Sequence, residues 1–203
     1  MAKIIIDAFG SDQGPTMVAN AVKLARQEKD FETILVGPED QMKPILEGVD
    51  KVEYIQTENY IENEESPVMA IRKKKDASIV LGLQRLNEEG DVLLSAGSTG
   101  ALLGGGYFIT KRLEGIERAC LAVWLPNPHG GTILVDSGAN MDTTPEILLQ
   151  FAVLGSAYSE ADLGVTRPRV GLLNVGTEEG KGDKRAVDTY KSLQDSSLNF
   201  IGN

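Results

Sequence analysis

Residues 92–106 read VLLSAGSTGALLGGG, and this stretch decides the fold class. The apolar start, residues 92–95, predicts a strand, and the small polar residues that follow it predict a tight loop. The apolar residues after Gly100 predict a buried helix. A strand that passes through a glycine loop directly into a helix is the building unit of α/β proteins.

The same unit recurs along the chain. Short apolar runs predict strands at residues 3–8, 32–36, 52–56, 92–95, 169–174 and 198–201, with two further strands at 119–124 and 132–135 that flank the turn NPHGG as a candidate hairpin. Apolar spacing and helix-start residues predict helices at 15–27, 39–46, 77–88, 99–112, 145–159 and 183–194, and Ser66 with Pro67 predicts one more helix start. The sequence therefore predicts one α/β domain over residues 1–203 with a mostly parallel sheet.

Composition excludes several classes of protein. The 20 basic and 30 acidic residues give a net charge of −10, which argues against a protein built to hold nucleic acid. No apolar run approaches 18 residues, so no membrane span is predicted. The single cysteine, Cys120, excludes an internal disulfide framework and suits a reducing cytoplasm. We interpret Cys120 as a small buried hydrophobe and the single histidine, His129, as a turn residue.

The end of the chain lacks the helix that would cover its last predicted strand. Only two residues follow residues 198–201, whereas parallel strands are normally covered on both faces. We expect the chain to be the N-terminal part of a longer protein, in preference to one that ends on a sheet edge.

Four loops that follow strands are candidate ligand sites: Asp7–Gly14, Ser95–Gly100, Asp136–Thr144 and Asn174–Gly182. The carboxyl ends of parallel strands are where α/β proteins bind ligands. In the second loop, hydroxyls from Ser98 and Thr99 and the close approach that Gly100 permits suit a phosphate. The loop matches neither a Walker A motif nor a dinucleotide fingerprint. A tight turn that only packs the following helix is the alternative.

The third loop carries Asp136, Asn140 and Asp142, oxygen ligands that could hold Mg²⁺. We prefer a different interpretation, in which these side chains bond their own backbone as turns and helix caps, and no metal is predicted.

Two other loops carry charged candidates. Lys181 lies between Gly180 and Gly182, on a loop that could close over an anion, and a solvated surface lysine is the equally weighted alternative. In the first loop, Asp7 and Asp12 could bind substrate or lysines, but a role in stabilising the loop is preferred.

Residues 72–75 form the only basic cluster of this acidic chain: Arg72, Lys73, Lys74 and Lys75. Such a cluster is either a solvated helix end that suits the helix dipole or a docking site for an acidic partner.

Five motifs together resemble one known family. They are IDAFGSDQGP (6–15), SPVMAIRKKKDASIVLGL (66–83), LLSAGSTGALLGGG (93–106), LVDSGANMD (134–142) and PRVGLLNVGTEEGKG (168–182). In order and spacing they resemble the PlsX family of bacterial phosphate acyltransferases, the acyl-ACP:phosphate transacylases. The chain departs from the family pattern at Phe9 and Ser11, where the family has Met and Gly, at Gln13 in place of histidine, and at Ser98 in place of asparagine.

The resemblance implies a reaction and a setting. Long-chain acyl-ACP and inorganic phosphate would give acyl phosphate and free ACP for phospholipid synthesis, without cofactor or metal. It implies a three-layer α/β/α sandwich related to phosphotransacetylases and isocitrate/isopropylmalate dehydrogenases. It also implies a cytoplasmic homodimer that associates peripherally with the membrane, and family chains that continue past Asn203. Acidic ACP would dock at Arg72–Lys75.

Phosphate is the nucleophile of that reaction, so the enzyme needs no nucleophilic side chain of its own and can act by positioning and charge stabilisation. Our hypothesis assigns the phosphate to Ser98, Thr99 and the Gly100 amide, and assigns the catalytic role of offsetting negative charge to Lys181. The remaining predicted substrate-binding residues are Asn140, Asn174 and Asp136.

Three alternatives remain. One is a phosphotransacetylase-like transfer from acyl-CoA to phosphate, and another is a non-catalytic module that binds acyl-ACP or phosphate. A nicotinamide dehydrogenase on the related fold is disfavoured, because no nucleotide fingerprint is present.

Overall fold

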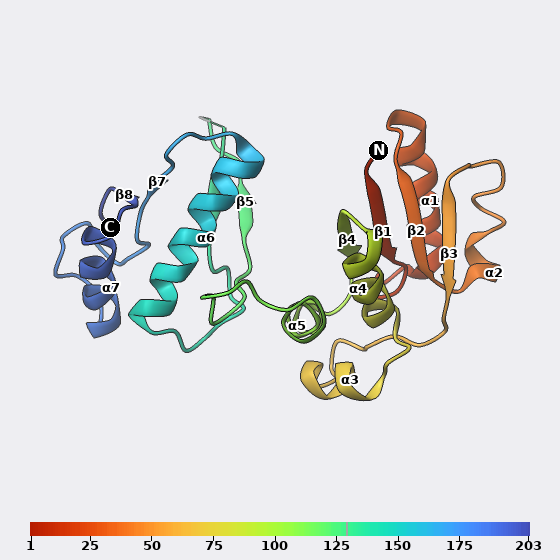
Figure 1. The fold of residues 1–203 in the computed structure, drawn as a ribbon, viewed down its shortest axis with the longest axis horizontal. Helices are drawn as coiled ribbons and strands as arrows, with labels where there is room; N and C mark the ends of the chain where they lie inside the picture. The colour runs from red at the N-terminus through yellow and green to blue at the C-terminus, as the bar shows by residue number, and fades with distance from the viewer. Residues whose placement is uncertain (129) are drawn as a thin grey trace. The chain divides into compact units, whose positions relative to one another are not determined.

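The fold is that of a computed structural model, which describes residues 1–128 and 130–203. These residues form two compact units, Met1–Leu113 and Glu114–Asn203 (Figure 1). The expectation of a single domain over residues 1–203 stays a prediction. No helix among the described residues has both the length and the apolar character needed to cross a bilayer.

The first unit is built on a four-stranded parallel sheet. Its strands are β1 (Lys3–Asp7), β2 (Glu32–Gly37), β3 (Val52–Gln56) and β4 (Val92–Ser95), in the order β3-β2-β1-β4. Asp7 pairs with Ser95 across β1 and β4, so these two strands end level with each other. The loops that follow them therefore start side by side.

Helices cover both faces of this sheet. On one face α1 (Gly14–Glu28) and α2 (Glu39–Met42) pack against Leu35, and on the other α4 (Ser78–Glu89) packs against Ile34 and Val36. Leu35 and its neighbours Ile34 and Val36 point to opposite faces because side chains alternate along a strand. The predicted three-layer α/β/α arrangement with a parallel sheet is confirmed in this unit.

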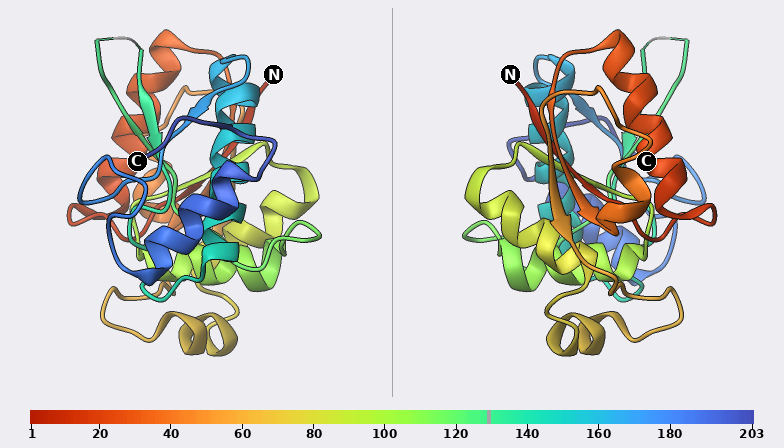
Figure 2. Two further views of the ribbon diagram at one scale, coloured as in Figure 1. Left: turned by 90° about the vertical axis from the view of Figure 1, so that its left-hand side faces the viewer. Right: turned by 90° about the vertical axis from the view of Figure 1, so that its right-hand side faces the viewer.

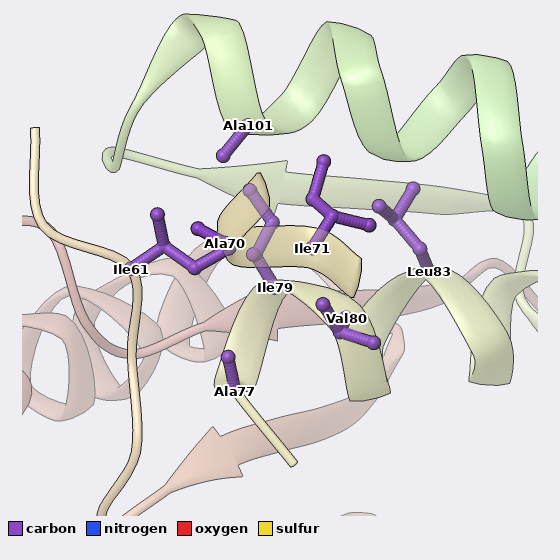
Figure 3. Packing of buried hydrophobic residues seen from close by; sticks show 8 residues of the cluster. All are labelled: Ile61, Ala70, Ile71, Ala77, Ile79, Val80, Leu83 and Ala101. Carbon is purple, nitrogen blue, oxygen red and sulfur yellow. The ribbon is translucent and has the colours of Figure 1, made fainter. Parts of the chain in front are cut away.

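A second apolar cluster lies where the remaining helices of the first unit meet α4 (Figure 3). These helices are α3 (Pro67–Lys73), α5 (Thr99–Gly105) and a π-helical turn, η1 (Gly106–Thr110). A Cβ at Gly105 would lie 2.2 Å from Leu83 Cδ1. A glycine in α5 is thus what lets this helix pack closely on α4. The cluster comprises Ile61, Ala70, Ile71, Ala77, Ile79, Val80, Leu83 and Ala101.

The second unit has shorter strands. β5 (Val123–Leu125) and β6 (Thr132–Leu134) form the predicted antiparallel hairpin, but the first strand, expected over residues 119–124, starts only at Val123. β7 (Arg169–Val170) pairs in parallel with β8 (Asn199–Phe200). α6 (Pro145–Leu163) and α7 (Lys184–Gln194) pack together (Figure 2). Thr144 and Asp183 cap the two helices through their side chains.

Several predicted boundaries were wrong. The helix expected over residues 39–46 ends at Met42 and continues as turns, and the helix expected over 99–112 changes to π-helical geometry at Gly106. The strand expected over 169–174 stops at Val170, because its partner β8 has only two residues and Leu173 is 85% exposed. Apolar runs mark where a strand can form, but a paired neighbour decides how far it extends.

Candidate functional site

The loops after β1 and β4 touch through their backbones. A Cβ at Gly10 would lie 2.2 Å from Gly97 Cα, and Gly10 has φ +89°, a conformation that favours glycine. Gly10 therefore has no room for a side chain here. The contact joins the first loop to the loop that carries Ser98.

Asp7 links the same two loops by hydrogen bonds. Its carboxylate is almost fully buried and accepts bonds from Ser95 Oγ at 2.8 Å and from the Phe9 amide at 3.1 Å. Ser95 Oγ in turn accepts a bond from the Gly97 amide at 3.1 Å. The preferred interpretation of Asp7 from sequence, a role in stabilising the loop, agrees with these contacts.

Burial raises the pKa of the Asp7 carboxyl above its ordinary value. Smaller effects lower it: Ser78, whose hydroxyl lies nearby but outside hydrogen-bonding geometry, and the bonds from Ser95 and Phe9. The folded protein therefore holds this proton to a higher pH than the unfolded chain does.

This shift predicts a pH-dependent stability. The contribution of Asp7 is fully present below the unfolded pKa of about 3.9 and is lost as pH rises through the higher folded pKa. We expect Asp7→Asn, which cannot ionise, to become more stable relative to wild type as pH rises from 4 to 8. Urea unfolding of both proteins across this range measures the difference, and a difference that stays constant with pH would contradict the expectation.

A small hollow opens beside Asp7. It has a volume of about 10 Å³, and its walls include the stacked rings of Phe9 and Tyr60, whose centroids lie 4.8 Å apart. Ser78 Oγ, on α4, is buried in its wall without a hydrogen-bond partner. The lining residues are Asp7, Phe9, Gly10, Tyr60, Ile61, Ser78, Ile79, Gly97, Ser98 and Ala101.

The predicted phosphate residues Ser98, Thr99 and Gly100 lie next to this hollow. Ser98 lines it and caps α5 by accepting a bond from the Ala101 amide at 3.3 Å, while Thr99 is exposed. A Cβ at Gly100 would lie 2.6 Å from Pro67 Cγ, so packing against α3 requires a glycine there. The structure thus brings the phosphate residues together with Asp7 in the first unit.

Asp136 and Asn140 lie together in the second unit. The Asp136 carboxylate accepts bonds from the Leu121 and Asn140 amides, both at 2.7 Å, and Asn140 Nδ2 donates to the Ala119 carbonyl at 2.9 Å. Both side chains bond the backbone, as the turn interpretation predicts. Among the described residues, no three His, Cys, Asp or Glu side chains form a group that could hold a metal.

Asn174 and Lys181 form the ends of another closed loop of the second unit. Asn174 Nδ2 donates to the Lys181 carbonyl at 3.0 Å, and Gly182, at φ +90°, leaves no room for a Cβ beside Asn174 Oδ1. The Lys181 side chain is 51% exposed, with Nζ 3.7 Å from a Glu178 carboxylate oxygen. The loop therefore presents its ammonium group to solvent.

The basic cluster is exposed except at one residue. Lys74 is half-buried and donates to Glu65 at 2.5 Å and to the Tyr60 carbonyl at 3.0 Å, whereas Arg72 and Lys73 are exposed at the end of α3. The Arg72 guanidinium also lies 5.4 Å from the Phe108 ring centroid. Arg72, Lys73 and Lys75 are therefore the members open to a partner.

The single cysteine of the chain does not have the properties of a nucleophile. Cys120 is half-buried, and burial raises the pKa of its thiol, as does the nearby charge of Asp136. Both effects oppose the thiolate that a nucleophile requires. The prediction for His129 lies outside the described residues.

Comparison with solved structures shows the fold. The EutD phosphotransacetylase from Staphylococcus aureus is 18% identical with a TM-score of 0.65, over 98% of this chain and 67% of that one. A branched-chain phosphotransacylase from Enterococcus faecalis V583 is 15% identical with a TM-score of 0.63, over 99% and 68%. These likenesses confirm the predicted relation to phosphotransacetylase folds.

Comparison of sequences identifies the family. Proteins named phosphate acyltransferase from Anoxybacillus flavithermus and Bacillus cereus are 46% and 44% identical over 99% of this chain. The chain spans 62% of the length of these relatives. Residues 2–203 match the family described as fatty acid synthesis protein. The chain therefore belongs to the fatty acid synthesis protein family.

Proposed function

We propose that the protein transfers a long-chain acyl group from acyl-ACP to inorganic phosphate, giving acyl phosphate and free ACP for phospholipid synthesis. The observation that carries the proposal is the 43–46% identity, over 99% of this chain, to proteins named phosphate acyltransferase. The phosphotransacylase-like fold supports acyl transfer to phosphate in general.

The proposed reaction needs an anion held against a thioester. A phosphate oxygen attacks the carbonyl carbon, the C–S bond breaks, and the sulfur leaves and takes up a proton as free ACP thiol. Ser98, Thr99 and the Gly100 amide bind the phosphate, and Lys181 offsets negative charge on the phosphate or the tetrahedral oxyanion. No side-chain nucleophile is used, which suits the raised pKa of the only thiol in the chain.

The assigned roles in the third and fourth loops also remain proposals. Asn140, Asn174 and Asp136 contribute to substrate binding, the first two by hydrogen bonds. Asp136 and Asn140 each hold backbone groups, and so does Asn174. In this proposal the three side chains maintain the shape of their loops and also contact the substrate.

Phosphate-dependent consumption of palmitoyl-ACP by the native protein tests the proposal, with acyl phosphate trapped by hydroxylamine. We expect hydroxamate to form only when phosphate is present. Palmitoyl-CoA as a parallel donor tests the second candidate, transfer from acyl-CoA, which the fold likeness to phosphotransacetylases favours. Binding of acyl-ACP by folded protein without turnover would contradict the enzyme and favour a binding module.

The docking of acidic ACP at the basic cluster gives a further prediction. Reversing the charges of the two exposed residues at the end of α3, Arg72→Glu and Lys73→Glu, should raise KM for acyl-ACP by about tenfold at low salt, because opposite charges steer association. Lys74→Gln should have a smaller effect on KM, since Lys74 is already bound to Glu65. Steady-state kinetics at two salt concentrations measures both, and an unchanged KM in the double variant would contradict the docking site.

The proposal also includes a homodimer that associates peripherally with the cytoplasmic face of the membrane. The family resemblance supports both properties. Light scattering of the native protein measures its oligomeric state, and flotation with anionic vesicles measures its association with membranes.

A further inference from the structure

We propose that the hollow beside Asp7 selects a protonated oxyanion: it receives one P–OH group of hydrogen phosphate, whose hydrogen Asp7 accepts, and it thereby discriminates against sulfate. This inference rests on the proposed use of phosphate. It adds Asp7 and Ser78 to the proposed site as residues that determine specificity.

The size of the hollow limits what can enter it. Its volume of about 10 Å³ suits a single oxygen atom with its hydrogen, because one water needs roughly 10–15 Å³ on this measure. A whole tetrahedral anion does not fit. One hydroxyl of the anion would enter the hollow, which Ser98 also lines, and its other oxygens would stay outside.

The polar groups in the wall suit a hydroxyl. An ionised carboxylate offers about four acceptor positions, and Asp7 uses two of them, for Ser95 Oγ and the Phe9 amide. Ser95 both donates and accepts, so it is satisfied. Ser78 Oγ, in a residue only 1% exposed, has no partner, which is uncommon for a buried hydroxyl. An entering hydroxyl would donate to Asp7 and accept from Ser78.

The charge of the hollow provides the discrimination. Asp7 is the only residue among those lining it that bears a formal charge at neutral pH, and Tyr60 is the other titratable one. Phosphate keeps at least one proton at neutral pH, whereas sulfate keeps none. A sulfate oxygen would therefore place negative charge against a buried carboxylate with no hydrogen between them, which is unfavourable at low dielectric. Arsenate, which is protonated like phosphate, should be accepted.

Protonation of Asp7 would remove this discrimination, because a neutral carboxyl can donate to sulfate. The preference for phosphate should therefore weaken as the pH falls. A merely structural role of Asp7 would not produce this dependence on the identity of the anion.

Equilibrium binding of phosphate, arsenate and sulfate to the native protein at pH 8 tests the inference. We expect phosphate and arsenate to bind at least about tenfold more tightly than sulfate, the scale of one hydrogen bond to a charged group. Asp7→Asn should reduce this ratio about tenfold, since an amide can donate to sulfate. Asp40→Asn, which removes the same charge at an exposed position on α2, should leave the ratio unchanged.

Ser78→Ala is the second variant. Because the Ser78 hydroxyl is buried without a hydrogen-bond partner but favours the nearby Asp7 carboxylate, its removal should lower the free energy of unfolding only slightly, while phosphate affinity falls several-fold. If folded Asp7→Asn keeps the wild-type ratio of phosphate to sulfate affinity, the inference is wrong. If Asp7→Asn does not fold, unchanged phosphate affinity in Ser78→Ala overturns it.

The two proposals fail in different ways. Selective phosphate binding without hydroxamate formation from acyl-ACP contradicts the proposed function and leaves the inference standing. Phosphate-dependent acyl transfer that sulfate inhibits as strongly as arsenate does overturns the inference alone.

Discussion

Lys181→Ala is expected to lower the turnover of acyl-ACP about 100-fold, the usual scale for removing one charge-stabilising group from a transition state. The variant should fold normally. The Lys181 side chain is half exposed, and its ammonium lies at 3.7 Å from the carboxylate of Glu178. Its backbone carbonyl, which accepts a bond from Asn174, is kept in the variant. A loss of turnover would therefore reflect chemistry and not stability.

Lys191→Ala is the matched control. Lys191 lies on α7 and is exposed, so its removal changes the net charge equally without touching the loop of residues 174–182. Initial rates at saturating acyl-ACP and phosphate measure both variants. Near-normal turnover of Lys181→Ala would show that Lys181 is a solvated surface lysine, the alternative that its sequence context leaves open.

Gly10→Ala is expected to reduce the free energy of unfolding by about 3 kcal/mol and to abolish phosphate binding. The left-handed φ of +89° costs a residue with a Cβ about 1–2 kcal/mol, and the new Cβ would lie 2.2 Å from Gly97 Cα. Neither backbone can yield alone, because the Asp7–Ser95–Gly97 hydrogen bonds hold both loops. The loop that carries Ser98 would be displaced.

Gly14→Ala separates the cost of the left-handed backbone from the cost of the steric contact. Gly14 also has a left-handed φ, +71°, but no atom lies within 4 Å of a Cβ placed there. It should lose only the conformational part, about 1–2 kcal/mol, and keep phosphate binding. Urea unfolding and phosphate binding measure both variants. Equal losses of stability would show that the contact between Gly10 and Gly97 contributes nothing.

Most of the first unit can be predicted from the sequence, because its signals are local. Apolar runs mark all four strands of the sheet, and Pro15 marks the start of α1 to within one residue. In the second unit the same signals overestimate the length of the strand that begins at Arg169, because this length depends on a partner strand far along the chain. Strand pairing is a tertiary property that a local pattern does not contain.

The candidate site also combines features that can be predicted from the sequence with features that depend on the tertiary structure. The hydroxyls of Ser98 and Thr99 are visible in the sequence as a loop motif. The relation of Asp7 to Ser95 depends on β1 and β4 being neighbours, which involves residues 88 positions apart. Ser78 gave no signal at all, because an ordinary serine at the start of a helix reveals neither its burial nor its missing partner.

The contact between Gly10 and Gly97 bears on how the evolution of this protein should be interpreted. Where two side chains meet, a larger one on one side can be offset by a smaller one on the other, and the two positions then drift together. Here both partners are already the smallest residue, and backbone meets backbone. No exchange at Gly97 can make room for a Cβ at Gly10, so Gly10 cannot vary and the pair leaves no trace of covariation, whereas a Cβ at Gly97 would lie 3.7 Å from Gly10 Cα. Invariance of Gly10 among homologues would record a steric limit and would not by itself mark it as catalytic.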